Sequence, residues 1–268
     1  MSEKYAYIQG NKLKLAVLDS LIMIQRSSTH IFRHTDQLMG AFFQPIMFLV
    51  LFSAVYSGAI RTGSDDTYTN FLMAGLIVQT LAFGSTATAL AVASDLKKGI
   101  VDRFKSLPMS NIAILNGHVV SDVFRNMISA TVLIVAGFAI GFRPNADALD
   151  WLILIGLTVL LTLAFSWLAA ILGIVAKSVE GVQWMTFVIV FPLTFASSAF
   201  VRPETMTSWL RGFAENQPIT HIVDTYRALL IGTPLGDSLW ISVVSLIGLV
   251  LVSMPVAAWL FKNKQTSN

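Results

Sequence analysis

The chain has 268 residues, of which 55% are hydrophobic and only 12% are charged, and its formal net charge is +3. A soluble domain carries about 25% charged residues, so this composition excludes an ordinary water-soluble protein and indicates a membrane protein. The chain contains no cysteine, which excludes disulfides, thiolate metal sites and cysteine nucleophiles.

The first candidate element is an apolar stretch at residues 13–24, which Lys14 and Asp19 interrupt. At about 1.5 Å per residue, this stretch is too short to cross a bilayer as a helix. A helix that lies in the membrane interface fits better than the alternative, a flexible tail. Residues 1–38 are therefore predicted to form a cytoplasmic and interfacial N-terminal region.

Six longer apolar stretches follow, and each approaches the roughly 20 residues that a spanning helix needs. They cover residues 39–60, 71–93, 112–142, 151–176, 182–200 and 239–261. We predict an all-α integral membrane protein with six transmembrane helices. It forms one domain over residues 1–268, with the membrane part at 39–261 and a tail at 262–268.

The positions of Lys and Arg predict the orientation, because cytoplasmic loops of membrane proteins carry an excess of both. With the N-terminus inside, twelve lie on the cytoplasmic side and five outside: Lys4, Lys12, Lys14, Arg26, Arg33, Lys97, Lys98, Arg103, Lys105, Lys177, Lys262 and Lys264 against Arg61, Arg143, Arg202, Arg211 and Arg227. Both termini are therefore predicted to be cytoplasmic, and the protein to be a multi-pass protein of the inner (cytoplasmic) membrane.

The cytoplasmic link at residues 95–108 has the pattern of a short amphipathic helix. On a helical wheel, the apolar side carries Leu96, Ile100, Phe104 and Leu107, and the opposite, charged side carries Lys98, Asp102 and Lys105. Arg103 falls on the apolar side, where a lone guanidinium is costly without a partner, and Pro108 ends the helix. The pattern favours docking into another protein as much as it favours an ordinary solvated loop.

Asp122 and Arg125 are three residues apart, so they can pair on one face of the third spanning helix. We expect this helix to carry them into the cytoplasmic interface. Charges near the membrane are expensive and are commonly paired or functional. The spacing therefore predicts an interfacial ion pair, with either a stabilising role or a role in gating.

The outer segment 201–238 is predicted to contain two short helices, one of which carries Trp209. Pro218 suits the first turn of the second helix and Gly232 its C-terminal cap. This helix has an apolar stripe, with Asp224 and Arg227 as an i,i+3 pair on its other side. We expect both helices to dip into the outer leaflet; a surface hairpin packed on the helix ends is the alternative.

Motifs for chemistry are absent from the sequence. It has no G-x-x-x-x-G-K-[ST] phosphate loop, no G-x-S-x-G and no H-E-x-x-H. No two of the four histidines have the spacing of a zinc site. We therefore expect no catalytic residue and no metal ligand, and we expect energy for any transport to arrive through a partner.

Several segments together resemble a known family. They are Gln44-Pro45, the run from Asp95 to Pro108, residues 191–200 (FPLTFASSAF), Trp209-Leu210, and residues 217–232 from Gln217-Pro218 to Gly232. Their order and spacing resemble the ABC-2 type transporter permeases, in particular the daunorubicin-resistance branch. The resemblance covers nearly the whole chain.

This resemblance implies the permease subunit of an exporter for an amphipathic drug, antibiotic or lipid-like molecule. It implies two copies of a separate ATPase, which would bind the ATP and magnesium, and a second permease copy or a paralogue. The link would act as the coupling helix through Asp95, Lys98, Gly99, Asp102, Arg103, Phe104 and Pro108. The first and fifth spanning helices would form the permease seam, with Phe42, Phe43, Phe48, Phe187 and Phe195 as candidates.

Two other functions remain open at this point. A polysaccharide or teichoic-acid permease of the same superfamily would share most of these features. An integral-membrane lipid-modifying enzyme would need Asp, His or Arg clustered at one membrane depth, and the charges in this sequence are scattered. Membrane lipids are expected partners in each case, and nucleic acid is not, because the chain has no basic tract.

Overall fold

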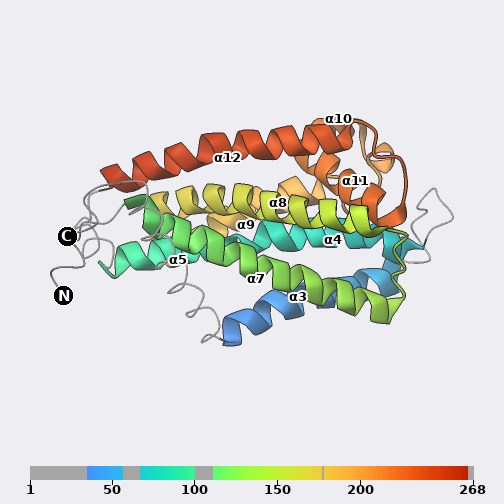
Figure 1. Cartoon of the computed structure of the whole chain (residues 1–268), viewed down its shortest axis with the longest axis horizontal. Coiled ribbons are helices and arrows are strands. Elements are labelled where there is room, and N and C mark those ends of the chain that lie inside the picture. Colours follow the sequence, from blue (N-terminus) through green and yellow to red (C-terminus); the bar gives the residue numbers. More distant parts are fainter. Residues whose placement is uncertain (1–34, 57–66, 100–110, 177, 265–268) are drawn as a thin grey trace.

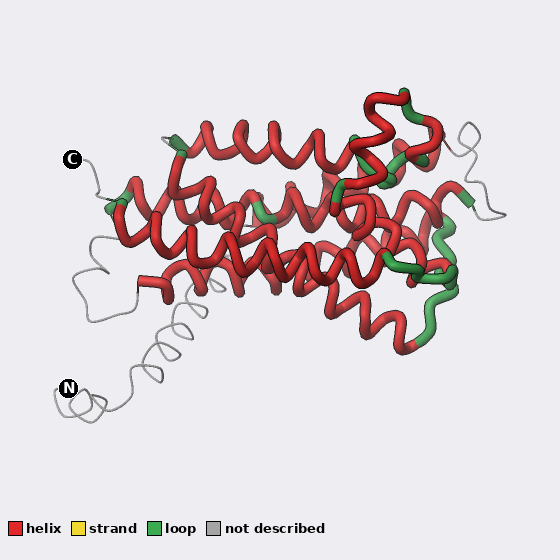
Figure 2. Tube along the Cα trace, turned by 90° about the horizontal axis from the view of Figure 1, so that it is seen from above, coloured by secondary structure: helices red, strands yellow, loops and turns green. Residues whose placement is uncertain are grey.

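The computed structural model describes residues 35–56, 67–99, 111–176 and 178–264. Within these ranges the chain forms helices joined by short loops and contains no strand (Figure 2). The helices are α3 (Thr35–Tyr56), α4 (Tyr68–Gly84), α5 (Thr86–Lys97), α7 (Asn111–Ile140), α8 (Ala148–Val175), α9 (Val179–Phe195), α10 (Ser208–Asn216), α11 (Pro218–Ile231) and α12 (Ser238–Asn263), with a short turn η1 (Pro203–Thr205).

The long helices lie side by side as an elongated bundle, with α10 and α11 gathered near one end (Figure 1). Four of them are long and apolar enough to cross a membrane: Tyr68–Lys97, Ile112–Ile140, Ala148–Val175 and Ser238–Asn263. The apolar parts of α3 and α9 that the structure describes are shorter, Phe43–Tyr56 and Val179–Phe195. The all-helical, multi-pass architecture is confirmed, and the count of six spans stays a prediction.

Three predicted helix bounds are wrong, and the first is the start of the first span, which lies at Thr35 and not at residue 39. The second span continues past residue 93 to Lys97, and it is broken at Ser85 into α4 and α5. The fifth span ends at Phe195 and not at residue 200. Serine explains this early end, because the Ser197 hydroxyl donates to the Thr194 carbonyl and accepts the N–H of Ala199 at 3.2 Å. Such local bonds compete with the helical hydrogen-bond ladder.

Helix α4 occupies the centre of the bundle. Every residue from Tyr68 to Ala82 is buried, and the helix packs against α3, α7, α8, α9 and α11. Its neighbours therefore replace lipid around the whole helix, which explains how it can carry Asn70 and Gln79. Asn70 uses this position to bind the loop after α7, since it accepts the N–H of Arg143 at 2.9 Å and donates to its carbonyl at 3.2 Å.

Helix α12 covers the other side of α8 and ends the described chain. Its last residues pack Ala257 and Phe261 into a cluster with Trp167 and Ile174 of α8 and Leu115 of α7. Just after the helix, the Lys264 ammonium donates to the carbonyl of Ile174. The same end of the bundle therefore holds the ends of α5, α8 and α12 and the start of α7 (Figure 1).

Candidate functional site

The first residues of the predicted coupling segment belong to the spanning helix α5. Asp95 lies in the last turns of α5, Lys98 caps the helix, and Gly99 has a φ of 64°. The prediction of one continuous helix from Asp95 through Gly99 is therefore wrong, because a left-handed glycine ends α5 there. Asp102, Arg103, Phe104 and Pro108 lie outside the described residues.

The Asp95 side chain makes its contact inside the bundle. Its carboxylate lies 3.0 Å from Nε2 of His118 on α7, and the two side chains are only 14% and 13% exposed. The next residue, Leu96, is buried against Ile114 and Trp167 in the cluster that α12 completes. Lys97 and Lys98 are exposed, so the cationic side chains at this end of α5 face outward and the carboxylate faces inward.

Asp122 and Arg125 form the predicted i,i+3 ion pair. The protein shields both groups, with the side chains 2% and 11% exposed. The Ser166 hydroxyl of α8 donates to Asp122, and the guanidinium of Arg125 donates to the carbonyl of Gly84, where α4 ends. The pair therefore joins three elements, α7, α8 and the break between α4 and α5.

The first pair lies near the middle of α7, and a second pair of the same design lies on α11, near the end of the bundle where α10 and α11 gather (Figure 1). Asp224 and Arg227 of α11 are also three residues apart, and their carboxylate and guanidinium are 2.7 Å apart. The Ser198 hydroxyl donates to Asp224 at 2.7 Å, and Arg227 donates to the Ser198 carbonyl at 2.6 Å. The Arg227 guanidinium also lies 3.8 Å from the centre of the Phe71 ring of α4, a cation–π contact.

These two Asp-x-x-Arg pairs, which we call the inner clamp (Asp122, Arg125) and the outer clamp (Asp224, Arg227), share two further features. Each carboxylate accepts from a serine of another segment, and each guanidinium binds a backbone carbonyl where a helix has just ended. A carbonyl at a helix end has lost its intrahelical donor and is costly to bury unpaired. Both clamps therefore compensate interruptions of spanning helices.

Helix α11 begins and ends as predicted, whereas the first outer helix, expected at 204–213, begins only at Ser208 and ends at Asn216. Pro218 occupies the first turn of α11, and Gly232, with a φ of 77°, caps its C-terminus. The sequence assigns Arg227 to a polar side of α11 opposite the apolar stripe. The structure instead packs it against α4, with its side chain only 14% exposed.

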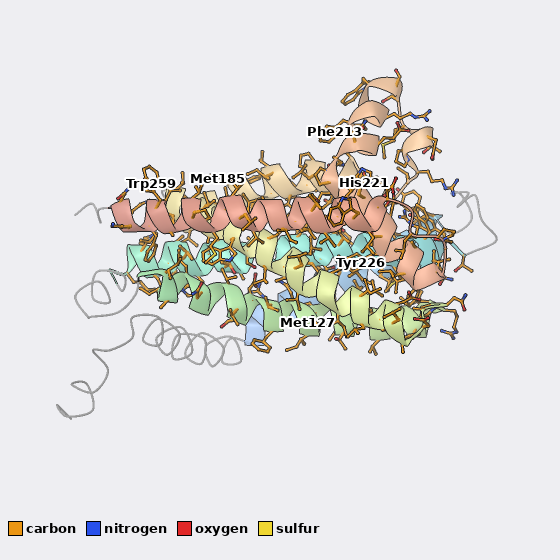
Figure 3. All side chains as sticks on the ribbon, turned by 45° about the horizontal axis from the view of Figure 1, so that its top comes forward. Met127, Met185, Phe213, His221, Tyr226 and Trp259 are labelled. Carbon is orange, nitrogen blue, oxygen red and sulfur yellow. The ribbon has the colours of Figure 1, made fainter. Side chains whose placement is uncertain are left out.

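Helix α10 is different from α11, because Ala214 is its only buried residue. It stands out sideways near the end of the bundle that also holds α11, and it carries the labelled Phe213 (Figure 3). Trp209 is 77% exposed and Phe213 is 50% exposed. Arg211 and Glu215 form an exposed pair at 2.7 Å, and the bond to Glu215 raises the pKa of the Arg211 guanidinium.

The aromatic residues predicted for the permease seam differ in exposure. Phe43 on α3 is 68% exposed and Phe187 on α9 is 45% exposed, so both face away from the core. Phe48 and Phe195 are half-buried and pack against the main core. The side chain of Phe42 lies outside the described residues.

The aromatic rings of α9 form a continuous series that reaches α3. Neighbouring ring centroids lie 4.1 to 6.3 Å apart along Trp184, Phe187, Phe191, Phe195 and Phe200. Phe200 then meets Phe52 of α3 at 5.2 Å, and Phe52 stacks on Phe48 at 5.6 Å. We call these seven residues the aromatic ladder.

Among the residues that the structure describes, no group of His, Cys, Asp or Glu could hold a metal ion.

The family model for the ABC-2 type transporter matches residues 20–231, which include the aromatic ladder, both clamps and the outer helices. The chain belongs to the ABC-2 type transporter family. This ABC-2 chain is 30% identical over 236 residues to the daunorubicin resistance ABC transporter permease protein DrrB1 of Streptomyces coeruleorubidus. The match covers 87% of this chain and 82% of that protein.

Further relatives of this ABC-2 chain are more distant. It is 22% identical to the probable doxorubicin resistance ABC transporter permease protein DrrC of Mycobacterium tuberculosis, over 84% of this chain and 81% of that protein. It is 25% identical to the putative transport permease ycf38 of Cyanophora paradoxa, over 80% and 74%. These relatives are transport permeases by name, and this chain is likewise a multi-pass membrane permease of the family.

Sequence reasoning missed part of what the structure brings together in this ABC-2 permease. It did not connect Ser166 and Gly84 with the inner clamp, or Ser198 and Phe71 with the outer one. One signal was available, because the Asp-x-x-Arg spacing occurs twice, as Asp122-Val-Phe-Arg125 and Asp224-Thr-Tyr-Arg227. A second signal was the four-residue spacing of Phe187, Phe191 and Phe195, which places their rings on one helix face.

Proposed function

We propose that this chain is the membrane-spanning subunit of an ATP-driven exporter for an amphipathic drug, antibiotic or lipid-like molecule, and that a separate subunit hydrolyses the ATP. The observation that carries the proposal is the similarity over 87% of the chain to a daunorubicin resistance permease. The whole chain, residues 1–268, would act as one membrane domain. ATP and magnesium would bind to the partner, since this chain has no phosphate-binding loop.

The helix lengths support six spans. Helix α3 has 22 residues and α9 has 17, which correspond to about 33 Å and about 25 Å at 1.5 Å per residue. A hydrocarbon core of about 30 Å is close to both lengths. Both termini would be cytoplasmic, and the end of the bundle that carries Lys97, Lys98, Lys262 and Lys264 would face the cytoplasm.

Two copies of the ATPase would dock at the cytoplasmic link after α5, with Lys98, Gly99, Asp102, Arg103, Phe104 and Pro108 as the contact segment. Support comes from the exposed Lys97 and Lys98 and from the left-handed Gly99, which ends α5 just before this segment. Asp95 would act from inside, through His118, and not as a contact with the ATPase.

A second permease, either an identical copy or a paralogue, would pack on the faces of α3 and α9 that carry Phe43 and Phe187. The exposed end of the aromatic ladder supports this seam. Trp184 is 70% exposed and Val188 is 63% exposed beside Phe187, so the described part of the chain leaves this face of α9 uncovered. Aromatic side chains provide a large apolar area and are frequent at the centres of protein interfaces.

The substrate would enter from the inner leaflet and leave on the outer side past α10 and α11. The walls that the bundle offers are apolar, with hydroxyl groups as the polar contacts, and such walls favour apolar bodies with few hydrogen bonds. Both clamp arginines already hold a carboxylate and a carbonyl. A highly charged substrate would therefore find no unused buried guanidinium in the described part of the chain.

ATP hydrolysis by the reconstituted complex across a panel of compounds tests this function. The permease would be purified with its ATPase in liposomes, and hydrolysis measured with amphipathic drugs, lipids, hydrophilic sugars and ions. We expect amphipathic compounds to stimulate hydrolysis and to be moved across the bilayer. Stimulation by sugars alone would favour the polysaccharide-type permease, and failure of any ATPase to bind the chain would refute the proposal.

A further inference from the structure

The break between α4 and α5 is unusual, because it interrupts the most deeply buried spanning helix. In an unbroken helix, the N–H of Thr88 would donate to the carbonyl of Gly84 four residues earlier. Here it donates to Ser85 at 3.0 Å, and the Ser85 hydroxyl donates back to Ala82 at 2.6 Å. Arg125 of the inner clamp supplies the donor that the Gly84 carbonyl has lost.

The two halves of this helix share three neighbouring helices and differ in two others. Helix α4 is anchored at the outer end, where the outer clamp covers Phe71 and Asn70 binds the loop after α7. Helix α5 packs on α7, α8 and α9, as α4 does, but its main contacts among the described helices do not include α3 or α11. The broken backbone between them allows one half to turn without the other, since helix kinks arise where the hydrogen-bond ladder is interrupted.

Polar contacts with α7 lie at both ends of α5, one just before its start and one in its last turns. At the break, the contact is Arg125 with the Gly84 carbonyl. At the cytoplasmic end, it is Asp95 with His118, whose polar atoms are 3.0 Å apart. Between these ends the contacts with α8 are close and apolar, with Ala89 and Ala93 buried beside Ala169. Helix α5 is therefore held by a polar contact at the break and by a second polar contact at its cytoplasmic end. Between the two it packs on α8 through small apolar side chains, which allow it to slide.

We propose that α5 is a lever that turns about the break at Gly84 and Ser85, with Arg125 as the positioning residue of this pivot and the Asp95–His118 pair as a latch. The lever rests on the proposed function, because its motion would be driven by an ATPase bound just after Lys97. Opening of the latch would move the cytoplasmic end of α5 away from α7, while the inner clamp keeps the buried Gly84 carbonyl paired.

A reversible cross-link across the latch tests the lever. The variant Asp95→Cys/His118→Cys, in an otherwise cysteine-free chain, would be joined by a short reducible thiol reagent in the complex with the ATPase. Transport should fall about tenfold on cross-linking and return on reduction, because the coupling between sites is lost. The matched control is Val175→Cys/Lys264→Cys, which joins α8 and α12 at the same end and should leave transport unchanged.

Transport at the unlinked rate by the cross-linked latch would overturn the lever. The proposed function would survive that result if the ATPase still bound and still drove transport. If the ATPase failed to bind the unmodified chain, the proposed function itself would be refuted. The two failures are therefore separate.

The pivot is tested by Arg125→Ala, with Arg143→Ala as its control. Arg143 follows the same helix, but it donates to the carbonyl of Phe138 in that helix and to the carbonyl of Phe142 just after it. Arg125→Ala should raise the ATP hydrolysed per exported molecule about tenfold while the ATPase stays bound. Arg125→Lys should restore part of the coupling, and Arg143→Ala should behave as the unmodified chain. An unchanged ratio in Arg125→Ala would overturn the pivot, and if this variant fails to insert, the cross-link alone decides.

Discussion

Two buried arginines, Arg125 and Arg227, explain how this apolar chain tolerates interrupted helices. Each is neutralised by an aspartate one helical turn earlier, and each gives a hydrogen bond to a carbonyl at a helix end. The planar guanidinium suits this task, because it can bind a carboxylate and a carbonyl at the same time. Lysine, with a compact ammonium on a flexible stem, is not an equivalent replacement.

Gly84 is expected to be intolerant of any side chain. A Cβ at this position would lie 1.9 Å from Oδ1 of Asn126, whereas a Cβ at Gly156 of α8 would meet nothing within 4 Å. Gly84→Ala should therefore reduce the stability of the purified protein by about 1–3 kcal/mol, as overpacking does. Gly156→Ala should be neutral or slightly stabilising, since alanine favours helices.

Thermal unfolding in detergent measures both variants. The double variant Gly84→Ala/Asn126→Ala should recover part of the loss, because it removes the atom that the new Cβ would meet. A Gly84→Ala protein as stable as the unmodified chain would show that α7 does not approach the break this closely.

The outer clamp should hold α11 on the bundle. Arg227→Ala leaves the Ser198 carbonyl without its side-chain donor and exposes the Phe71 ring, and it should cost about 1–3 kcal/mol. Limited proteolysis of the segment 201–236 in intact membranes should then become faster. Arg211→Ala is the control, because that side chain is exposed and pairs only with Glu215 on its own helix. Equal proteolysis of the two variants would argue against the clamp.

At the scale of the elements, apolar length predicts where helices lie, and polar contacts between helices decide where they end. The sequence predicts spans at 151–176 and 239–261, and the structure has α8 and α12 within three residues of these bounds. It does not predict the break at Ser85, because Gly84 and Ser85 are ordinary in a membrane helix and their partners Arg125 and Asn126 come about 40 residues later. Long-range side-chain contacts of this kind leave no local pattern.

The left-handed turn at Gly99 is expected to direct the coupling segment. Gly99→Ala should strain this turn and uncouple ATP hydrolysis from transport, because a residue with a Cβ avoids a φ of 64°. Gly236 is the matched control position, because it also has a positive φ, 51°, in the loop before α12 at the other end of the bundle. Gly236→Ala should carry the same local strain and leave the coupling intact.

The readout is the ratio of exported molecules to hydrolysed ATP in liposomes. Arg103→Ala, in the same link, should uncouple transport as Gly99→Ala does while leaving membrane insertion normal. Normal ratios in both variants would exclude the link as the docking segment.

At the scale of the whole molecule, the uncovered faces of α3 and α9 predict how two permeases meet. A cysteine at Phe43 on one copy and at Phe187 on the other should cross-link across the seam in native membranes. The background is clean, because the chain has no cysteine of its own. Leu152→Cys on α8 is the control, since Leu152 is 65% exposed on another element. Cross-linking of the α8 pair in place of the seam pair would place the interface elsewhere.

The central position of α4 also bears on how the protein is made. This helix is synthesised early, yet α8 and α11, which cover much of its surface, come from the later part of the chain. Until Pro218–Ile231 has left the ribosome, α4 lacks part of the cover that the finished bundle gives it. A nascent chain that stalls before α11 would therefore leave part of this central helix, including the Phe71 ring that Arg227 covers, in contact with lipid or the insertion machinery.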